Sequence, residues 1–371
     1  MTEREAAIAF NMVPDIGYVR MQALIAEAGS AAAAWEQLPE KNDWQKKPVE
    51  WEREIENAEK ARIKIVTIFD EEYPSSLRDL PSPPLCLYTS GNIARLSDRC
   101  VAMVGTRSMS YYGREMAETI AYGLAIAGWT VVSGLAAGID GAAHWGALNA
   151  HGGRTVGVLG GALDCFYPQE NRDLGRMIVR QGGCVASEYP LGRKPDYRTF
   201  PQRNRIVAAL VKGVVAVETP IKGGTLITCD IAADLGRCVM AVPGPANAKL
   251  SAGCHQLIRD GATLVTNVDE VVECLSELAP KREVPVLRQP LVPLDVKPLP
   301  KPGKDAPQQP PKVELSILEE AVYKHISEAG CTTDKIANDL KLPGQDVNKT
   351  LVALRMKRLI RFAPGNRVLR A

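Results

Sequence analysis

Residues 99–140 decide the fold, and they read RCVAMVGTR (99–107), SMSYYGREMAETIAYGLAIAGW (108–129) and TVVSGLAAGID (130–140). The apolar run before Gly105 ends abruptly, as a buried parallel strand does where it enters a loop. The middle segment has apolar residues at helical spacing and closes at Gly128. A second apolar run then ends at Ser133-Gly134. The pattern of strand, glycine turn and helix thus occurs twice in succession. It predicts a doubly wound sheet, and such sheets bind ligands beyond the carboxyl ends of their strands.

Both glycine turns fall on the same rim of the predicted sheet, and each precedes a helix whose free N–H groups favour anions. The same alternation continues along the chain, so we expect one large α/β domain, Rossmann-like and mostly parallel, over residues 61–279. Its later strands are predicted at 155–160, 184–188, 214–218, 238–242 and 262–266, and its later helices at 167–181, 204–212, 225–235 and 268–278.

Three other segments flank this domain. Residues 1–60 have a helical pattern with a turn at Gly17, typical of a helix-hairpin-helix unit that seats a phosphate, or of a small domain used only for packing and contacts. A helix exposed to solvent is expected over residues 41–62. Residues 280–312 contain ten prolines and predict an extended linker. Residues 313–371 predict three helices and a terminal hairpin, as in a winged helix.

The end of that last domain is basic. Seven Lys or Arg residues and no acidic residue follow Asn348, which favours contact with duplex DNA or with a protein partner. They are Lys349, Arg355, Lys357, Arg358, Arg361, Arg367 and Arg370.

The composition excludes several classes of protein. A chain of 371 residues with 46% hydrophobic and 24% charged residues is typical of globular proteins, and no apolar run approaches the roughly 20 residues that span a bilayer. The N-terminus lacks the features of a signal peptide, so we expect a cytoplasmic protein without membrane contact. Only four histidines occur, at no metal-ligand spacing, and we expect no metal and no cofactor. With a net charge of +2, any anion site needs local positive charge.

The nine cysteines are scattered and form no Cys-x-x-Cys pair. Cys100, Cys184, Cys229 and Cys238 lie within apolar stretches, which predicts buried free thiols.

Gly105, Thr106 and Arg107 follow the first core strand directly. Here a glycine allows a phosphate to approach the backbone, a threonine donates through its hydroxyl, and an arginine offers a planar fork. The alternative is a plain turn with a solvated arginine. A nicotinamide site is disfavoured, because the chain has no Gly-x-Gly-x-x-Gly motif at this position.

The second turn contains Ser133, Gly134, Ala136 and Gly138, whose small side chains predict a phosphate cradle. Asp140 and His144 follow at a spacing that places them on one helix face. They are either an acid–base pair or members of structural hydrogen bonds.

Phe200, Arg203, Asn204 and Arg205 combine an aromatic ring with cationic side chains, which is what single-stranded nucleic acid requires. The alternative is that one arginine pairs with Glu188 or Glu218.

Lys222, Gly223, Gly224 and Thr225 begin the helix after a later strand and again suit a phosphate. Rossmann enzymes that handle sugar phosphates have glutamates after such a turn. Here residues 227–229 are Ile-Thr-Cys, which weakens the enzyme interpretation.

Taken in order, these stretches resemble the DNA-processing protein A family. The resemblance runs from about residue 70 to 278 and is carried by VGTR (104–107), SGLAAGID (133–140), YP (167–168), SEYP (187–190), FPQRNR (200–205) and VPG (242–244). It implies a homodimeric single-stranded DNA-binding protein of natural transformation, which protects incoming strands and helps load the RecA recombinase for homologous recombination. The resemblance implies no enzymatic activity.

Two departures from the family pattern concern the predicted rim. The family usually has Ser-Gly-Ser or Ser-Gly-Thr in place of residues 222–224, and a glycine in the run that holds Ala208 and Ala209 here.

The alternative function is a Rossmann-type enzyme acting on a nucleotide or sugar phosphate, with His144, Asp140 or Asp164 as acid or base. The residues expected to contact DNA are Gly105, Thr106, Arg107, Ser133, Gly134, Ala136, Gly138, Phe200, Arg203, Asn204, Arg205, Lys222, Gly223, Gly224 and Thr225.

Overall fold

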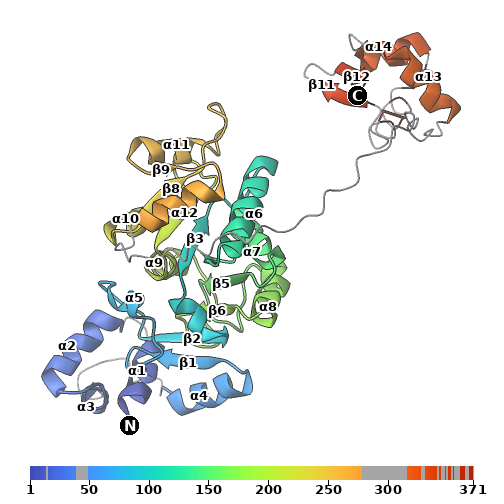
Figure 1. Ribbon diagram of the computed structural model, residues 1–371. Helices are drawn as coiled ribbons and strands as arrows, with labels where there is room; N and C mark the ends of the chain where they lie inside the picture. The colour runs from blue at the N-terminus through green and yellow to red at the C-terminus, as the bar shows by residue number, and fades with distance from the viewer. Residues whose placement is uncertain are drawn as a thin grey trace, which may run out of the picture. The chain divides into compact units, whose positions relative to one another are not determined.

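The chain forms two compact units, Met1–Pro285 and Val286–Ala371, in the computed structural model (Figure 1). The expected linker (280–312) lies outside the described residues, as does most of the third helix expected in the last domain. The structure describes residues 1–13, 16–38, 49–277, 316–326, 331–340, 342–343, 347, 350–351, 354, 360–363 and 367–370.

A nine-stranded sheet forms the centre of the first unit, in the order β1-β2-β6-β5-β4-β3-β7-β8-β9. Strand β2 is antiparallel to both of its neighbours, and all other pairs are parallel. The chain proceeds outward from β3 to β6 and then returns to β7 on the other side of β3, so the loops after β3 and β7 diverge at a topological switch point. This confirms the doubly wound, mostly parallel sheet. The strands are β1 Lys64–Thr67, β2 Cys86–Gly91, β3 Cys100–Val104, β4 Thr130–Ser133, β5 Arg154–Leu159, β6 Cys184–Ser187, β7 Gly213–Ala216, β8 Cys238–Ala241 and β9 Thr263–Leu264.

Helices cover both faces of the sheet, which explains why β3 has no polar residue. Val101 and Met103 pack into the core on one face, while Ala102 and Val104 pack into the core on the other. The first face carries α6 Tyr111–Ile126, α7 Ile139–Asn149, α8 Arg172–Arg180 and α12 Val268–Glu277; the second carries α9 Thr199–Leu210, α10 Gly224–Asp234 and α11 Ala252–Arg259.

The N-terminal helices share the core of the sheet. Phe10 is fully buried with its ring edge-on to Trp35, 5.2 Å between centroids, and lies in the same apolar cluster as β2. Because residues 1–60 share this core with the sheet, the structure does not mark them off as a separate domain, and the boundary at residue 60 stays a prediction. These elements are α1 Glu3–Met12, α2 Tyr18–Ala28, α3 Ala31–Gln37, α4 Trp51–Lys60 and α5 Ser75–Arg78.

Residues 41–48 of the solvated helix expected over 41–62 lie outside the described residues, and for one face of α4 the expectation is wrong. Glu54 is buried, and its Oε1 accepts a hydrogen bond of 2.7 Å from the backbone N–H of Leu191. Burial raises the pKa of this carboxyl, and the bond to Leu191 opposes the shift. Helix α4 thus fixes the loop between β6 and α9.

The second unit contains the predicted hairpin. Strand β12 lies between β10 and β11 in a three-stranded sheet, and the hairpin is formed by β11 and β12. Arg370, one of the seven basic residues, lies 4.9 Å over the ring of Tyr323 and donates to the carbonyls of Tyr323 and Lys324. The side chains of the other six lie outside the described part. The elements are α13 Ile317–His325, β10 Cys331–Thr332, α14 Thr333–Leu340, β11 Ile360–Ala363 and β12 Arg367–Arg370.

The prediction of a free thiol is wrong for Cys238, which forms a disulfide with Cys274. Helix α12 packs against β8 and brings the two cysteines together, a proximity that a separation of 36 positions conceals in the sequence. Cys100, Cys184 and Cys229 are buried free thiols, as expected. Across the described residues, helices of the length and apolarity needed to cross a membrane are absent.

Close packing of α6 against α7 gives a test of the fold. A Cβ at Gly146 would overlap the backbone of Glu118, whereas a Cβ at Gly141 in the same helix would have only ordinary contacts, the nearest at 3.5 Å. We expect Gly146→Ala to lower the free energy of unfolding by about 1–3 kcal/mol. Gly141→Ala should be neutral, or stabilising by up to about 1 kcal/mol, through helix propensity. Denaturant titration measures both, and equal effects would contradict the packing.

Candidate functional site

A groove of about 270 Å³ lies at the carboxyl ends of β3, β4 and β7, beside the first turns of α9 and α10. This is the rim that the sequence predicts. Among the described residues it is lined by most of the predicted site: Gly105, Thr106, Arg107, Gly134, Ala136, Phe200, Arg203, Asn204, Gly223, Gly224 and Thr225. The remaining predicted residues, Ser133, Gly138, Arg205 and Lys222, do not line it.

An exposed cation and two aromatic rings lie in a row at one end of this groove. The guanidinium carbon of Arg107 is 4.8 Å from the ring centroid of Phe200, and the ring of Tyr167 is 5.9 Å from that of Phe200. All three residues line an adjoining hollow of about 80 Å³, and of the three only Arg107 and Phe200 line the groove itself. Tyr167 is about half exposed. Tyr167 is not among the residues predicted to contact DNA, although the Tyr-Pro motif at residues 167–168 is a signal that points to it.

Arg203 is not a solvated cation. It is 5% exposed, and its Nη1 donates to the carbonyl oxygens of Gly134 and Val158. Burial lowers the pKa of Arg203, and the nearby carboxylate of Asp140 opposes this shift. Its role in the groove is to anchor α9 to the ends of β4 and β5.

The glycines of the first two turns serve protein contacts rather than the approach of a ligand. A Cβ at Gly134 would overlap the guanidinium of Arg203, and one at Gly105 would overlap Ile139. Gly138 has φ +79°, and a Cβ there would overlap the carbonyl of Thr106. Of the rim glycines, Gly224 is the one at which an added Cβ would meet no atom within 4 Å, so its backbone is open to a ligand.

The structure contradicts the phosphate cradle that the sequence predicts at residues 133–138. The N–H groups of Gly134 and Ala136 donate to Oδ2 of Asp140, at 3.0 and 3.4 Å, so a carboxylate of the protein occupies the place foreseen for an anion. The hydroxyl of Ser133 is buried and donates to the carbonyl of Met103 at 2.6 Å. Burial raises the pKa of Asp140, opposed by Arg203 and by the two N–H groups.

His144 and Asp140 take part in separate structural hydrogen bonds. Oγ1 of Thr155 donates to the carbonyl of Val131 at 2.6 Å, so it accepts from Nδ1 of His144, also at 2.6 Å. Nε2 is buried without a partner among the described residues. Burial lowers the pKa of His144 to about 3, which keeps the ring neutral. Of the two alternatives for this pair, the structural one fits.

The two arginines behind Phe200 differ in position. Arg205 pairs with Glu188 outside the groove, so the expectation that it lines the rim is corrected, and the alternative pairing holds for it. Asn204 remains at the groove, where its Nδ2 donates to the carbonyl of Gly224 at 3.4 Å and its Oδ1 accepts from Arg203 at 3.1 Å.

Helix α10 supplies the backbone donors that the second turn does not. It begins at Gly224, and no side chain caps its first N–H groups. Such groups carry partial positive charge and bind anions. Lys222 is exposed two residues earlier. Within the described ranges, no group of His, Cys, Asp and Glu could hold a metal ion.

Buried His144 predicts a dependence of stability on pH. Its pKa is lowered in the folded state, so between about pH 6.5 and 3 the unfolded chain binds more protons, and stability falls as pH falls. At pH 4.5 this amounts to about 2–3 kcal/mol. We expect His144→Asn to lose less free energy of unfolding than the unaltered chain between pH 7.5 and 4.5. Exposed His151, changed to Asn, is the control, and parallel pH profiles for all three chains would refute the assignment.

Comparison with known proteins adds to this geometry. The sequence profile of the DNA recombination-mediator protein A family matches residues 64–276. The DNA processing protein DprA of Streptococcus pneumoniae is 42% identical over 206 residues, which cover 56% of this chain and 72% of that protein.

Two solved structures are similar to this one. The crystal structure of DNA processing protein A from Streptococcus pneumoniae aligns with a TM-score of 0.61 and 32% identity, covering 74% of this chain and 98% of that one. The structure of DNA processing protein A from Helicobacter pylori, which concerns its single-stranded DNA binding mode, aligns with a TM-score of 0.52 and 28% identity. It covers 58% of this chain and 98% of that one.

Proposed function

Because this chain belongs to the DNA recombination-mediator protein A family, we propose that it binds single-stranded DNA in the groove at the ends of β3, β4 and β7. The observation that carries the proposal is the exposed guanidinium of Arg107 over Phe200, with Tyr167 beside them. A cation interleaved with aromatic faces suits a chain of phosphates with unstacked bases. The single-stranded DNA binding of the Helicobacter pylori relative supports the same assignment.

The groove offers different contacts to the phosphates and to the bases of the DNA. Phe200 and Tyr167 provide faces on which bases stack. Arg107 binds one phosphate, and the uncapped start of α10 with Lys222 binds another. Arg203 holds these elements in place. Its guanidinium donates to carbonyl oxygens of the protein, so we assign it no phosphate contact.

The biological role we propose is that of the family in natural transformation. The protein protects incoming single strands, helps load the RecA recombinase for homologous recombination, and acts in the cytoplasm as a homodimer of the sheet domain. It binds without turnover. Two of the three candidate acid or base residues, His144 and Asp140, are buried. The third, Asp164, is exposed outside the rim groove and accepts hydrogen bonds of 3.0 Å from the N–H of Gly192. These positions support binding over the alternative of a nucleotide enzyme.

Arg107→Ala tests the rim groove directly. Losing one phosphate contact should weaken binding of single-stranded DNA roughly tenfold for all sequences. It should also reduce the slope of log affinity against log salt concentration by about 0.7. Fluorescence anisotropy at several salt concentrations measures both quantities.

Arg114→Ala is the matched control, because Arg114 is an exposed arginine of α6 paired with Glu118. It should leave affinity and salt slope unchanged. If Arg107→Ala behaves like this control, Arg107 is an ordinary surface residue. Binding to mononucleotides, with release of product, would favour the enzyme.

For residues 313–371 we propose contact with duplex DNA, because the basic residues are concentrated near the terminal hairpin. Deleting this segment should weaken binding to a duplex with a single-stranded tail more than binding to a plain single strand. Electrophoretic mobility shifts on the two substrates measure the difference. Equal losses, or none, would assign the segment to a protein partner.

A further inference from the structure

A second groove, of about 510 Å³, lies on the other side of α9 from the rim groove. One wall is the end of α1 and the start of α2, and the other is the segment from Glu188 to the second turn of α9. Its lining includes the rings of Tyr18 and Tyr189, the side chains of Arg193, Arg198 and Arg205, and Glu188.

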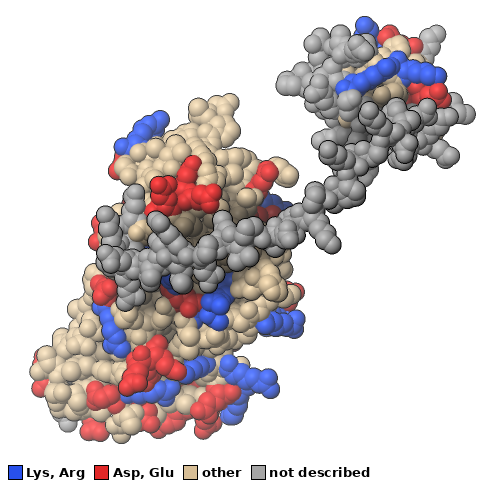
Figure 2. All heavy atoms as spheres, in the orientation of Figure 1, with Lys and Arg blue, Asp and Glu red and all other residues tan. Residues whose placement is uncertain are grey.

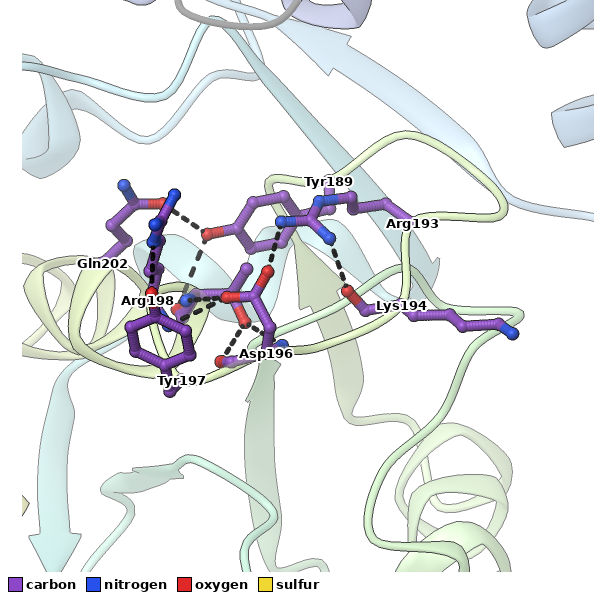
Figure 3. A network of polar contacts seen from close by, with 8 residues as sticks. Tyr189, Arg193, Lys194, Asp196, Tyr197, Arg198 and Gln202 are labelled. Carbon is purple, nitrogen blue, oxygen red and sulfur yellow. Dashed lines mark hydrogen bonds and ion pairs between the residues drawn. The ribbon is translucent and has the colours of Figure 1, made fainter.

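The described lining of this second groove carries three guanidinium groups against one carboxylate. Arg193 is paired with Asp196 at 2.6 Å, yet its side chain is still 45% exposed. Arg198 is exposed and has no carboxylate within 4 Å among the described residues; its Nε donates to the hydroxyl of Tyr197 at 2.9 Å (Figure 3). Arg205 is paired with Glu188, the one acidic residue among the described residues of the lining. The described lining therefore carries more positive than negative charge.

One nitrogen of Arg205 has no hydrogen-bond partner among the described residues. Nη1 of Arg205 is buried and forms no hydrogen bond within the described part, although Nη2 is bonded to Glu188. A buried charged donor left without an acceptor is costly, unless a ligand or solvent supplies one. Arg205 thus keeps one guanidinium nitrogen without an acceptor among the described residues.

The loop that presents these arginines is fixed at both sides. The backbone N–H of Leu191 donates to Glu54 of α4 at 2.7 Å, and Nδ2 of Asn11 on α1 donates to the carbonyl of Glu188 at 3.1 Å. Figure 3 shows the polar contacts that continue from Tyr189 to Gln202, where the two side chains are 2.8 Å apart. The arginines thus lie on a preorganised segment.

Helix α9 presents one face to each groove. Phe200, Arg203 and Asn204 line the rim groove, whereas Gln202 and Arg205 line the second. Tyr197 and Arg198 directly precede the helix; Tyr197 is 75% exposed, and Arg198 lines the second groove.

From this arrangement we infer that a single strand continues from the rim groove across the start of α9 into the second groove, where the arginines bind its phosphates. The inference rests on the proposed function and extends its site. Tyr18 and Tyr189 in the lining give the second groove the mixture of aromatic and cationic groups that single strands favour. An acidic peptide would use the charges but not these rings. The N-terminal helices then serve as one wall of a longer DNA site.

The test compares two lengths of oligothymidylate on the full chain. A short one of about 6 nucleotides fills the rim groove alone, and a long one of about 20 nucleotides reaches both. Replacing two arginines by Arg193→Ala/Arg198→Ala should weaken binding of the long strand roughly tenfold. The slope of log affinity against log salt should fall by about 1.4 for the two lost phosphate contacts. Binding of the short strand should not change.

Two further variants serve as controls. Arg53→Ala removes an exposed arginine paired with an acid three residues away, as Arg193 is, but on α4 outside both grooves. It should affect neither length. Arg193→Lys/Arg198→Lys keeps the charge and should retain most of the affinity for the long strand, which separates loss of charge from local unfolding.

The outcomes separate this inference from the proposed function. Loss confined to the long strand supports the second groove. Equal loss on both lengths, or no loss on either, overturns it, and the latter would leave the second groove to a protein ligand. Arg107→Ala reports on the rim independently: if it leaves binding of the short strand intact, the rim assignment fails whatever the second groove does.

Discussion

The buried guanidinium of Arg203 is the interaction on which the site depends. It binds the carbonyls of Gly134 and Val158 beside the carboxylate of Asp140, so it joins α9 to the ends of two parallel strands. Losing this guanidinium would leave buried carbonyl acceptors unsatisfied, which costs about 1–3 kcal/mol each. The absence of a Cβ at Gly134 follows from this contact. So does the position of Phe200, which lies one helical turn from Arg203.

With α9 fixed in this way, its two faces acquire different surroundings. One meets the loops of the topological switch point, and the other meets the N-terminal helices. The chain as a whole carries a net charge of only +2, and Figure 2 shows acidic and basic side chains interspersed over the face in view. An attraction for a polyanion must then come from local arrangements such as the arginines of α9 and its preceding loop.

The fold was largely predictable, because a strand buried on both faces has to be apolar, as residues 100–104 are, and glycines mark where such strands end. The rim groove was predictable for the same reason. The sequence did not show which groups of the rim groove are free to contact a ligand. Gly134 and Ala136 look like anion donors, but the acceptor is Asp140, and sequence does not show hydrogen-bond partners. The same limit concealed the disulfide of Cys238 and the proximity of Tyr167 to Phe200, and it left the pairing of Arg205 with Glu188 as one of two alternatives.

The rim groove also contains a physical reason for preferring single strands. In a duplex the faces of the bases are stacked on their neighbours, so only the edges and the phosphates are accessible. The ring centroids of Phe200 and Tyr167 are 5.9 Å apart with the ring planes tilted by 46°, and such rings gain stacking energy only from bases that are already unstacked. The phosphates of a duplex could still reach Arg107, but the aromatic contribution would be lost. Under the proposed function, discrimination against duplex comes from the rings, while the arginines set the affinity and its dependence on salt.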